Sequence, residues 1–312
     1  TISISNPITK WSYEITSADE VAYVMAKAFY IARSGRPGPV MISTTKNAQV
    51  EKTEYGYEAF KCERGGDSFY SSYTADDIVE AVKLINSAER PMIIVGQGIT
   101  LSESEKELLT FAEKSNMPVV STLLGVSSFP TDHELFIGNV GMHGNYAPNM
   151  MTQQSDLIVA LGMRFSDRVI GDASRYAPKA KIVHVEIDRS EINKTVKVDV
   201  AINGNVKEVL PKLIEGAKFA DRKPWFEHIK QMMAKEQYNL CQPLLNKSGC
   251  LNMAMVIDSV ARNAGGEAVV VTDVGQNQMY AAQYSKFNHG MSFLTSGGLG
   301  TMGYGLPAAM GA

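Results

Sequence analysis

Residues 74–98, "TADDIVEAVKLINSAERPMIIVGQG", contain the pattern that the middle of the chain repeats. Apolar residues recur at helical spacing over 75–88, and Thr74 precedes them as a helix N-cap. The run "PMIIV" that follows is short, apolar and ended by Gly96, which is typical of a buried strand. The stretch therefore predicts a helix, then a buried strand, then a glycine turn at the carboxyl end of that strand.

The same alternation continues through the middle of the chain. Further helices are predicted over 103–115 and 206–218, and further strands over 118–122, 156–162 and 181–188. Strands separated by helices favour a parallel, doubly wound sheet that is covered on both faces. We therefore expect residues 74–222 to form one complete α/β domain.

Each flank carries part of another α/β unit. Residues 16–44 predict a helix and the strand "VMIST", with no pairing strand expected upstream, so 1–50 is interpreted as the end of a domain. Residues 51–73 lose periodicity around a Gly-Gly pair and predict a linker. "DRKPWFEH" predicts a second linker, and 223–312 continues with a helix, the strand "EAVVVTDVG" and a glycine-rich end that indicates the front of a third unit.

Composition excludes several functional classes. The chain has 312 residues, is 45% apolar and 20% charged, and carries a net charge of −3, which gives no electrostatic reason to expect nucleic acid or an anionic membrane. No apolar run approaches the roughly 20 residues that span a bilayer, and no signal peptide is predicted. Cys62, Cys241 and Cys250 are odd in number and lack C-x-x-C spacing, which argues against a disulfide framework and a zinc site. A cytoplasmic location is expected.

Four predicted strands of the middle domain end in groups that could hold a nucleotide. In an open α/β sheet, ligands bind beyond the carboxyl ends of the strands. Glycine lets backbone N–H groups approach a phosphate, arginine offers a bidentate fork, and an acidic side chain can hold a ribose hydroxyl. A tight turn would explain any one glycine, but the four ends together predict a nucleotide cleft. The groups are Gly96-Gln97-Gly98, Thr122-Leu123, Gly162 with Arg164, and Glu186-Ile187.

Two further features leave alternatives open. Gly298, Gly300 and Gly303 spell G-x-G-x-x-G, but the acidic residue of a dinucleotide fingerprint would fall beyond residue 312. A loop pressed against another bulky ligand fits equally well. His143, between Gly141 and Gly144, is a candidate contact or a local hydrogen-bonding residue. No second ligand stands at metal-binding spacing, so no metal site is predicted there.

Seven motifs together resemble one enzyme family. In chain order they are "GRPGPVMISTTKNAQ", "STLLGVSSFP", "VGMHGNY", "LGMRFSDRV", "KIVHVEIDRSEI", "TDVGQNQMYAAQ" and "TSGGLGTMGYGLPAA". This series is similar to the catalytic large subunit of the acetolactate synthases, thiamine diphosphate-dependent enzymes with pyrimidine-binding, FAD-binding and diphosphate-binding α/β domains. The resemblance implies an internal fragment: a complete central doubly wound domain (74–222) flanked by the end of the pyrimidine-binding domain (1–50) and the front of the diphosphate-binding domain (223–312).

The resemblance also implies site residues. Those matching FAD contacts are Arg36, Gly96, Gln97, Gly98, Thr122, Leu123, Gly141, Met142, His143, Gly162, Arg164, Glu186, Ile187 and Asn205. Those matching thiamine diphosphate contacts are Val274, Gly275, Gln276, Asn277, Gly300 and Met302, and those matching the substrate channel are Lys46, Asp167 and Arg168. Asn277 stands where the family usually has histidine, whereas Ser166 and Asn205 stand where aspartate is more usual.

The reaction implied is decarboxylation of pyruvate and carboligation to a second 2-ketoacid, pyruvate or 2-ketobutyrate, in branched-chain amino acid biosynthesis. Thiamine diphosphate, Mg²⁺ and FAD are the implied cofactors. A second catalytic subunit, in a homodimer or tetramer, and a small regulatory subunit are the implied partners. No catalytic residue or metal ligand is assigned within 1–312, since the activating glutamate is expected upstream and no Gly-Asp-Gly segment occurs. We therefore expect these 312 residues alone to be inactive.

Two other functions are compatible with the motifs. Pyruvate oxidase or another thiamine diphosphate-dependent decarboxylase would share the glycine-rich end, whereas Gly-Met-His-Gly with Arg-Phe-Ser-Asp-Arg favours the synthase. A non-catalytic FAD-binding or nucleotide-binding module is the alternative from a different functional class.

Overall fold

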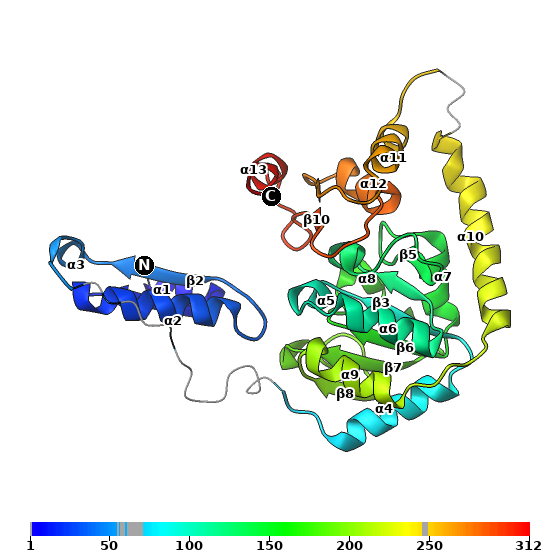
Figure 1. Cartoon of the computed structure of the whole chain (residues 1–312), viewed down its shortest axis with the longest axis horizontal. Coiled ribbons are helices and arrows are strands. Elements are labelled where there is room, and N and C mark those ends of the chain that lie inside the picture. The colour runs from blue at the N-terminus through cyan, green and yellow to red at the C-terminus, as the bar shows by residue number, and fades with distance from the viewer. Residues whose placement is uncertain (1, 55, 57–59, 61–70, 245–248) are drawn as a thin grey trace. The chain divides into compact units, whose positions relative to one another are not determined.

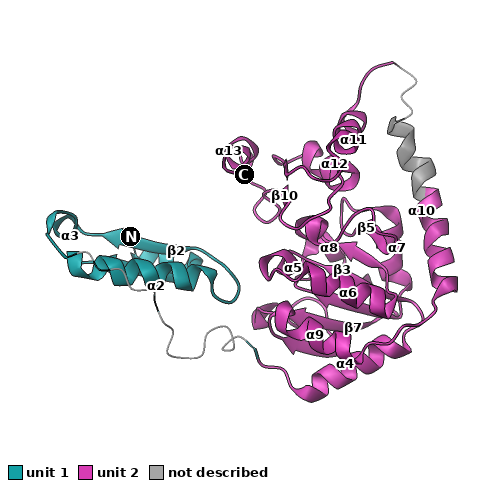
Figure 2. Cartoon of the chain, viewed as in Figure 1, with its two compact units in different colours: residues 1–71 teal, residues 72–312 magenta. Residues whose placement is uncertain are grey.

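The structure, a computed structural model, describes residues 2–54, 56, 60, 71–244 and 249–312, and the side chains of 236–244 lie outside that description (Figure 1). The chain divides into two compact units, Thr1–Ser71 and Ser72–Ala312 (Figure 2). Much of the linker predicted at 51–73, Cys62 included, lies outside the described residues. None of the described helices is both long enough and apolar enough to cross a membrane.

The first unit is built on a parallel β-α-β arrangement. Strand β1 (Trp11–Ile15) pairs with β2 (Val40–Thr44), and helix α2 (Val21–Arg33) connects them. The expectation of no pairing strand upstream of "VMIST" was wrong. The segment "WSYEI" has no apolar run, and only Ile15 in it is fully buried, which is why the sequence pattern did not indicate a strand. The short helices of this unit are α1 (Ile2–Ser5) and α3 (Lys46–Val50).

The second unit contains the predicted doubly wound sheet. Its six strands are all parallel and lie in the order β5-β4-β3-β6-β7-β8 (Figure 1). The chain starts at β3, proceeds outward to β5, and then returns to β6 on the other side of β3. The sheet therefore has a topological switch point between β3 and β6. The strands are β3 (Pro91–Val95), β4 (Val119–Ser121), β5 (Phe136–Asn139), β6 (Leu157–Leu161), β7 (Lys181–Glu186) and β8 (Val200–Asn203).

Helices cover both faces of this sheet because alternate strand residues point to opposite sides. Ile93 and Val95 of β3 pack in the core with α4 (Ala75–Ser87), α6 (Glu105–Ser115) and α9 (Val206–Gly216). Met92 and Ile94 pack in the opposite core with α7 (Tyr146–Gln154) and α10 (Lys223–Leu244). As predicted, Thr74 caps α4: its hydroxyl accepts the Asp77 amide, and the Asp77 carboxylate accepts the Thr74 amide.

The predicted linker "DRKPWFEH" is wrong, because this segment begins α10 and packs on the sheet domain. Trp225 is buried, and its Nε1–H donates to the Pro91 carbonyl at 2.9 Å. Arg222, just before the helix, is also buried, and its guanidinium donates to the carbonyls of Ile85 and Ala88 at 3.0 and 3.1 Å. A buried arginine that donates to backbone carbonyls far away in the sequence looks like a surface residue in sequence, which explains the error.

The last part of the chain forms a smaller α/β element. Strands β9 (Val270–Val271) and β10 (Phe293–Leu294) are parallel, and α12 (Gln276–Tyr284) connects them. Helices α11 (Met253–Ala264) and α13 (Gly305–Gly311) flank this pair in the sequence. The buried Asn139 side chain joins this part to the six-stranded sheet, since it accepts from the Ser121 hydroxyl and donates to the Ala282 carbonyl, both at 2.6 Å.

Candidate cofactor-binding site

The four strand ends that carry the predicted nucleotide-binding groups lie side by side. Val95 is the register partner of both Ser121 and Leu161, and Leu161 is the partner of Val185. The four residues that directly follow these register partners therefore line a single edge of the sheet. At about 4.8 Å between strands, the row is about 14 Å long. Its members are Gly96, Thr122, Gly162 and Glu186.

Glycines at the switch point allow two turns to touch. The Gly98 amide donates to the Gly162 carbonyl at 2.9 Å. A Cβ on Gly98 would lie 2.5 Å from the Gly162 Cα, and one on Gly96 would lie 2.4 Å from the Gly162 oxygen. Gly162 itself has φ +56°, a conformation that favours glycine. Glycine is therefore needed at these positions because the turns after β3 and β6 pack against each other.

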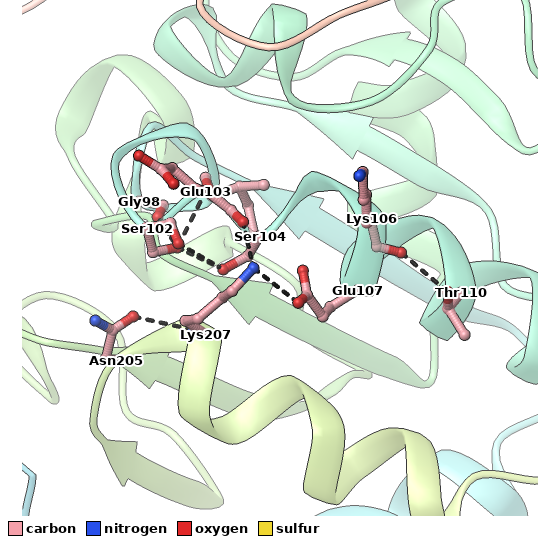
Figure 3. Close-up of polar contacts among 10 residues, drawn as sticks. Gly98, Ser102, Glu103, Ser104, Lys106, Glu107, Thr110, Asn205 and Lys207 are labelled. Atoms are coloured by element: carbon pink, nitrogen blue, oxygen red, sulfur yellow. Dashed lines mark hydrogen bonds and ion pairs between the residues drawn. The ribbon is translucent and has the colours of Figure 1, made fainter.

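The corner behind Gly98 is held by the start of α9 (Figure 3). Ser102 is the C-cap of helix α5 (Gly98–Leu101), and its hydroxyl donates to the Gly98 carbonyl at 2.6 Å. Lys207 donates to the carbonyl of Glu103, whose backbone is in the left-handed conformation, and forms an ion pair with Glu107 at 2.7 Å. Asn205 caps α9 by accepting the Lys207 amide at 3.0 Å. This capping role suits asparagine and aspartate equally.

The Gly141–His143 loop after β5 meets the loop after β6. The Met142 amide donates to the Arg168 carbonyl at 2.8 Å, and a Cβ on Gly141 would lie 2.7 Å from that same oxygen. Asn149 holds Gly141 in place, since its side-chain amide accepts the Gly141 N–H and donates to the Gly141 carbonyl, both at 2.9 Å. His143 is exposed, and its carbonyl accepts from Gln283 at 2.8 Å.

Arg164 is the cation closest to the switch point in sequence. Its neighbours Met163 and Phe165 are buried, whereas Arg164 is exposed, and no side-chain partner is recorded for it among the described residues. Asp167 and Arg168 lie in the short helix α8 (Asp167–Ile170), and both are exposed. The Arg168 Nε lies 3.7 Å from the Asp167 Oδ2. An ion pair with such exposure contributes little to stability. Arg164 and Arg168 can therefore both turn toward an anionic ligand.

Histidine 184 supports the loop that carries Arg164. It is fully buried in β7, and its Nε2 lies 2.8 Å from the Met163 carbonyl oxygen. Because a carbonyl only accepts, Nε2 carries the proton in the neutral ring. Burial lowers the pKa of this imidazole below its usual 6.5. The ring is thus neutral at neutral pH and supports the loop by its hydrogen bond to Met163.

At the end of β7, a buried carboxylate and an amide shape the turn. Glu186 is buried, and its Oε1 accepts the Asp188 amide at 3.0 Å. Asn203 of β8 donates to the carbonyls of Glu186 and Ile187 at 2.9 and 3.0 Å. At the end of β4, Thr122 is buried, its amide donates to the Val95 carbonyl, and Leu123 begins a 3-10 turn.

The glycine-rich end has a different geometry from the switch point. Gly275, Gly300 and Gly303 have φ values of +125°, +64° and +88°. A Cβ on Gly275 or Gly303 would meet nothing within 4 Å, and one on Gly300 would meet only Val274, at 3.9 Å. These glycines are required by backbone conformation, and they leave open space beside the chain. The other predicted contacts here, Gln276, Asn277 and Met302, range from partly buried Asn277 to strongly exposed Met302.

Two predicted residues belong to the other compact unit. Arg36 follows α2 and Lys46 begins α3, so both lie within 1–71, and both are exposed. All other predicted site residues lie within 72–312. Across the described ranges, no group of three or more His, Cys, Asp or Glu side chains could hold a metal ion.

Sequence reasoning missed the side chains that hold these loops. Asn149 and Lys207 carry no motif, because each acts on backbone groups that its own turn does not reveal. Asp273 was also missed, although it lies two residues after the end of β9 and directly before the predicted contacts Val274 and Gly275. An acidic side chain just after a strand, with a glycine two residues further on, was the available signal.

Comparison with known families agrees with this arrangement. A model of the thiamine pyrophosphate enzyme central domain matches residues 78–213, and a model of the C-terminal TPP-binding domain of these enzymes matches 273–312. The chain belongs to the thiamine pyrophosphate enzymes. The central-domain match of this family covers all six strands of the sheet, and the C-terminal match begins at Asp273.

Individual relatives resemble the chain from end to end. It is 38% identical to an acetolactate synthase large subunit of Corynebacterium glutamicum, covering 99% of the chain and 50% of the relative. It is 39% identical to the acetolactate synthase isozyme 1 large subunit of Escherichia coli, covering 100% of the chain and 54% of the relative. A Lactococcus lactis acetolactate synthase large subunit is 36% identical with the same coverage. The chain spans about half the length of the curated relatives it matches.

Replacing Gly98 tests the packing at the switch point of the six-stranded sheet. Gly98→Ala would place a methyl group 2.5 Å from the Gly162 backbone, which cannot give way as a flexible side chain would. We expect the free energy of unfolding in urea to fall by about 1–3 kcal/mol, the scale of overpacking. Gly298→Ala is the control, because its methyl group meets nothing within 4 Å. Equal stability of the two variants would contradict the contact.

Proposed function

We propose that this chain is part of the catalytic subunit of an acetolactate synthase, which decarboxylates pyruvate and joins the product to a second 2-ketoacid. The observation that carries the proposal is that two motifs typical of the synthase meet in the fold. Gly-Met-His-Gly and Arg-Phe-Ser-Asp-Arg are joined by the bond from the Met142 amide to the Arg168 carbonyl. The end-to-end similarity to acetolactate synthase large subunits supports the same function.

We assign the domains on the same basis. Residues 1–50 would be the end of a pyrimidine-binding domain, 74–222 a FAD-binding domain and 223–312 the front of a diphosphate-binding domain. The family-model matches at 78–213 and 273–312 lie inside the second and third of these.

The row of strand ends fits FAD. A dinucleotide needs an extended edge, donors and a cation for its pyrophosphate, and an acid for a ribose. The edge from Thr122 to Glu186 has the extent, exposed Arg164 supplies the cation, and Glu186 supplies the acidic side chain at the end of β7. Arg164 would hold the pyrophosphate, and the Gly141–His143 loop would close over one side of the site.

The glycine-rich end fits thiamine diphosphate. Open space beside Gly275, Gly300 and Gly303 lets the backbone approach a phosphorylated ligand closely. Bound there, the cofactor would supply the electron sink that decarboxylation requires. Magnesium prefers several oxygen ligands. We assign no magnesium ligand among the described residues.

The chain's own cations would guide the substrates. A 2-ketoacid carries a carboxylate, and the exposed Arg168 lies in α8, where its carbonyl accepts from the Met142 amide. Arg168 would orient that carboxylate, and the roles of Asp167 and of Lys46, which belongs to the first unit, stay predictions. Use of 2-ketobutyrate, assembly with a second catalytic or a regulatory subunit, and a cytoplasmic location stay predictions.

The product formed from pyruvate tests the function. The whole protein, supplied with thiamine diphosphate, Mg²⁺ and FAD, should form acetolactate without consuming oxygen. A pyruvate oxidase would instead consume oxygen and form no acetolactate, and a non-catalytic module would leave pyruvate unchanged. Either of these results would replace the proposal with the corresponding alternative.

Arg164→Ala tests the FAD site. Removing a charged hydrogen-bond donor to the pyrophosphate should weaken FAD binding by about 1.5–3 kcal/mol, or roughly 10- to 100-fold in Kd. Quenching of flavin fluorescence on titration measures the affinity directly. Arg175→Ala is the matched control, because the Arg175 side chain is 86% exposed and its ion pair with Asp172, at 3.7 Å, is long. An unchanged Kd in the Arg164 variant would refute the assignment.

A further inference from the structure

We propose that Asp273 is a positioning residue that holds the glycine-rich loop, residues 296–305, in the shape that receives thiamine diphosphate. The inference rests on the proposed function for the identity of the ligand. Nothing in the motif comparison singled out this side chain. Its role follows from its contacts.

Both oxygens of the Asp273 carboxylate are occupied by backbone donors. Oδ1 accepts the amide of Val274 at 2.8 Å and that of Gly303 at 3.1 Å. Oδ2 accepts the amides of Gly303 and Gly305, both at 3.0 Å. Bonds of this kind to a carboxylate are about twice as strong as neutral ones. One side chain thus ties the turn after β9 to a loop 30 residues further along.

The other hydrogen bonds that the structure describes for this loop join residues close to one another in sequence. Ser296 accepts from the amides of Gly300 and Thr301, and Gly297 donates to the neighbouring Thr295. Among the described residues, Asp273 is therefore the side chain that links this loop by hydrogen bonds to the strand before α12. Gly303 is exposed and has positive φ, so a loop released from Asp273 would have many other conformations available.

The charge of Asp273 argues for positioning rather than for direct contact with the ligand. A carboxylate repels a diphosphate, and these oxygens are already filled by N–H donors. The same donors, Gly305 first, lower the pKa of Asp273, so the group remains ionised at neutral pH. A Cβ on Gly305 would come within 2.9 Å of the Asp273 amide nitrogen, so the start of α13 is packed onto this residue.

The test has two parts, of which the first needs no cofactor. Hydrogen exchange of this chain, read at the Gly303 and Gly305 amides, should be slow in the wild type and at least about tenfold faster in Asp273→Ala. Asp258→Ala is the control, because Asp258 is paired with Arg262 on α11 and should leave both amides unchanged. Equal exchange in wild type and Asp273→Ala would overturn the proposal.

The second part measures cofactor affinity in the whole protein with Mg²⁺. Asp273→Ala should raise the Kd for thiamine diphosphate at least about tenfold while the Kd for FAD changes less than about twofold. Retained FAD affinity shows that the variant is folded. Asp273→Asn keeps the size but places an NH₂ group against an amide donor, so it should also bind weakly. Equal binding in either variant would mean that Asp273 does not shape the site, and tighter binding would mean that its charge only repels the ligand; either result would overturn the proposal.

The two parts separate the two claims. If the wild-type protein binds no thiamine diphosphate, the proposed function fails, while the exchange data still decide whether Asp273 holds the loop. If the wild type binds and Asp273→Ala binds equally well, the function stands and the role of Asp273 is refuted.

Discussion

The hydrogen bond from the Gly98 amide to the Gly162 carbonyl joins the two turns at which the chain changes direction across its sheet. Strands β3 and β6 are neighbours in space but lie more than 60 residues apart in sequence. Their turns can meet only if neither carries a side chain at the contact, since a Cβ would lie within 2.7 Å of the opposing backbone from either side. Arg164 follows Gly162 by two residues, so this contact fixes the start of the loop that carries Arg164.

The loops of both candidate cofactor sites are shaped by side chains that stand behind them. Asn149 holds Gly141, Lys207 holds the corner next to Gly98, and Asp273 holds Gly303 and Gly305. Each acts on backbone groups, which leaves the outer face of the loop for a ligand. A scaffold of this kind positions flexible glycine-containing segments before any ligand arrives, which lowers the ordering cost of binding.

Much of the central sheet could be predicted from the sequence, because its inner strands are buried on both faces. Such strands are continuous apolar runs, and β3, β4, β6 and β7 were recognised for that reason. The edge strands β5 and β8 and the short β1 were missed, because each mixes polar with apolar side chains and lacks a continuous apolar run. The buried Arg222 and Trp225 were mistaken for a linker, since their partners lie far away in the sequence.

The candidate site followed from the sequence only in part. Glycines and Arg164 at strand ends could be found because parallel strands end at one edge, whereas Asn149, Lys207 and Asp273 depend on contacts that no local pattern encodes. FAD binding at the switch point is the proposal on which this interpretation of the sheet edge depends, and hydrogen exchange of the chain with and without FAD tests it. We expect slower exchange over 96–101, 141–143 and 162–166, with 270–305 unchanged. Slowing confined to 270–305, or no slowing at any of these segments, would contradict it.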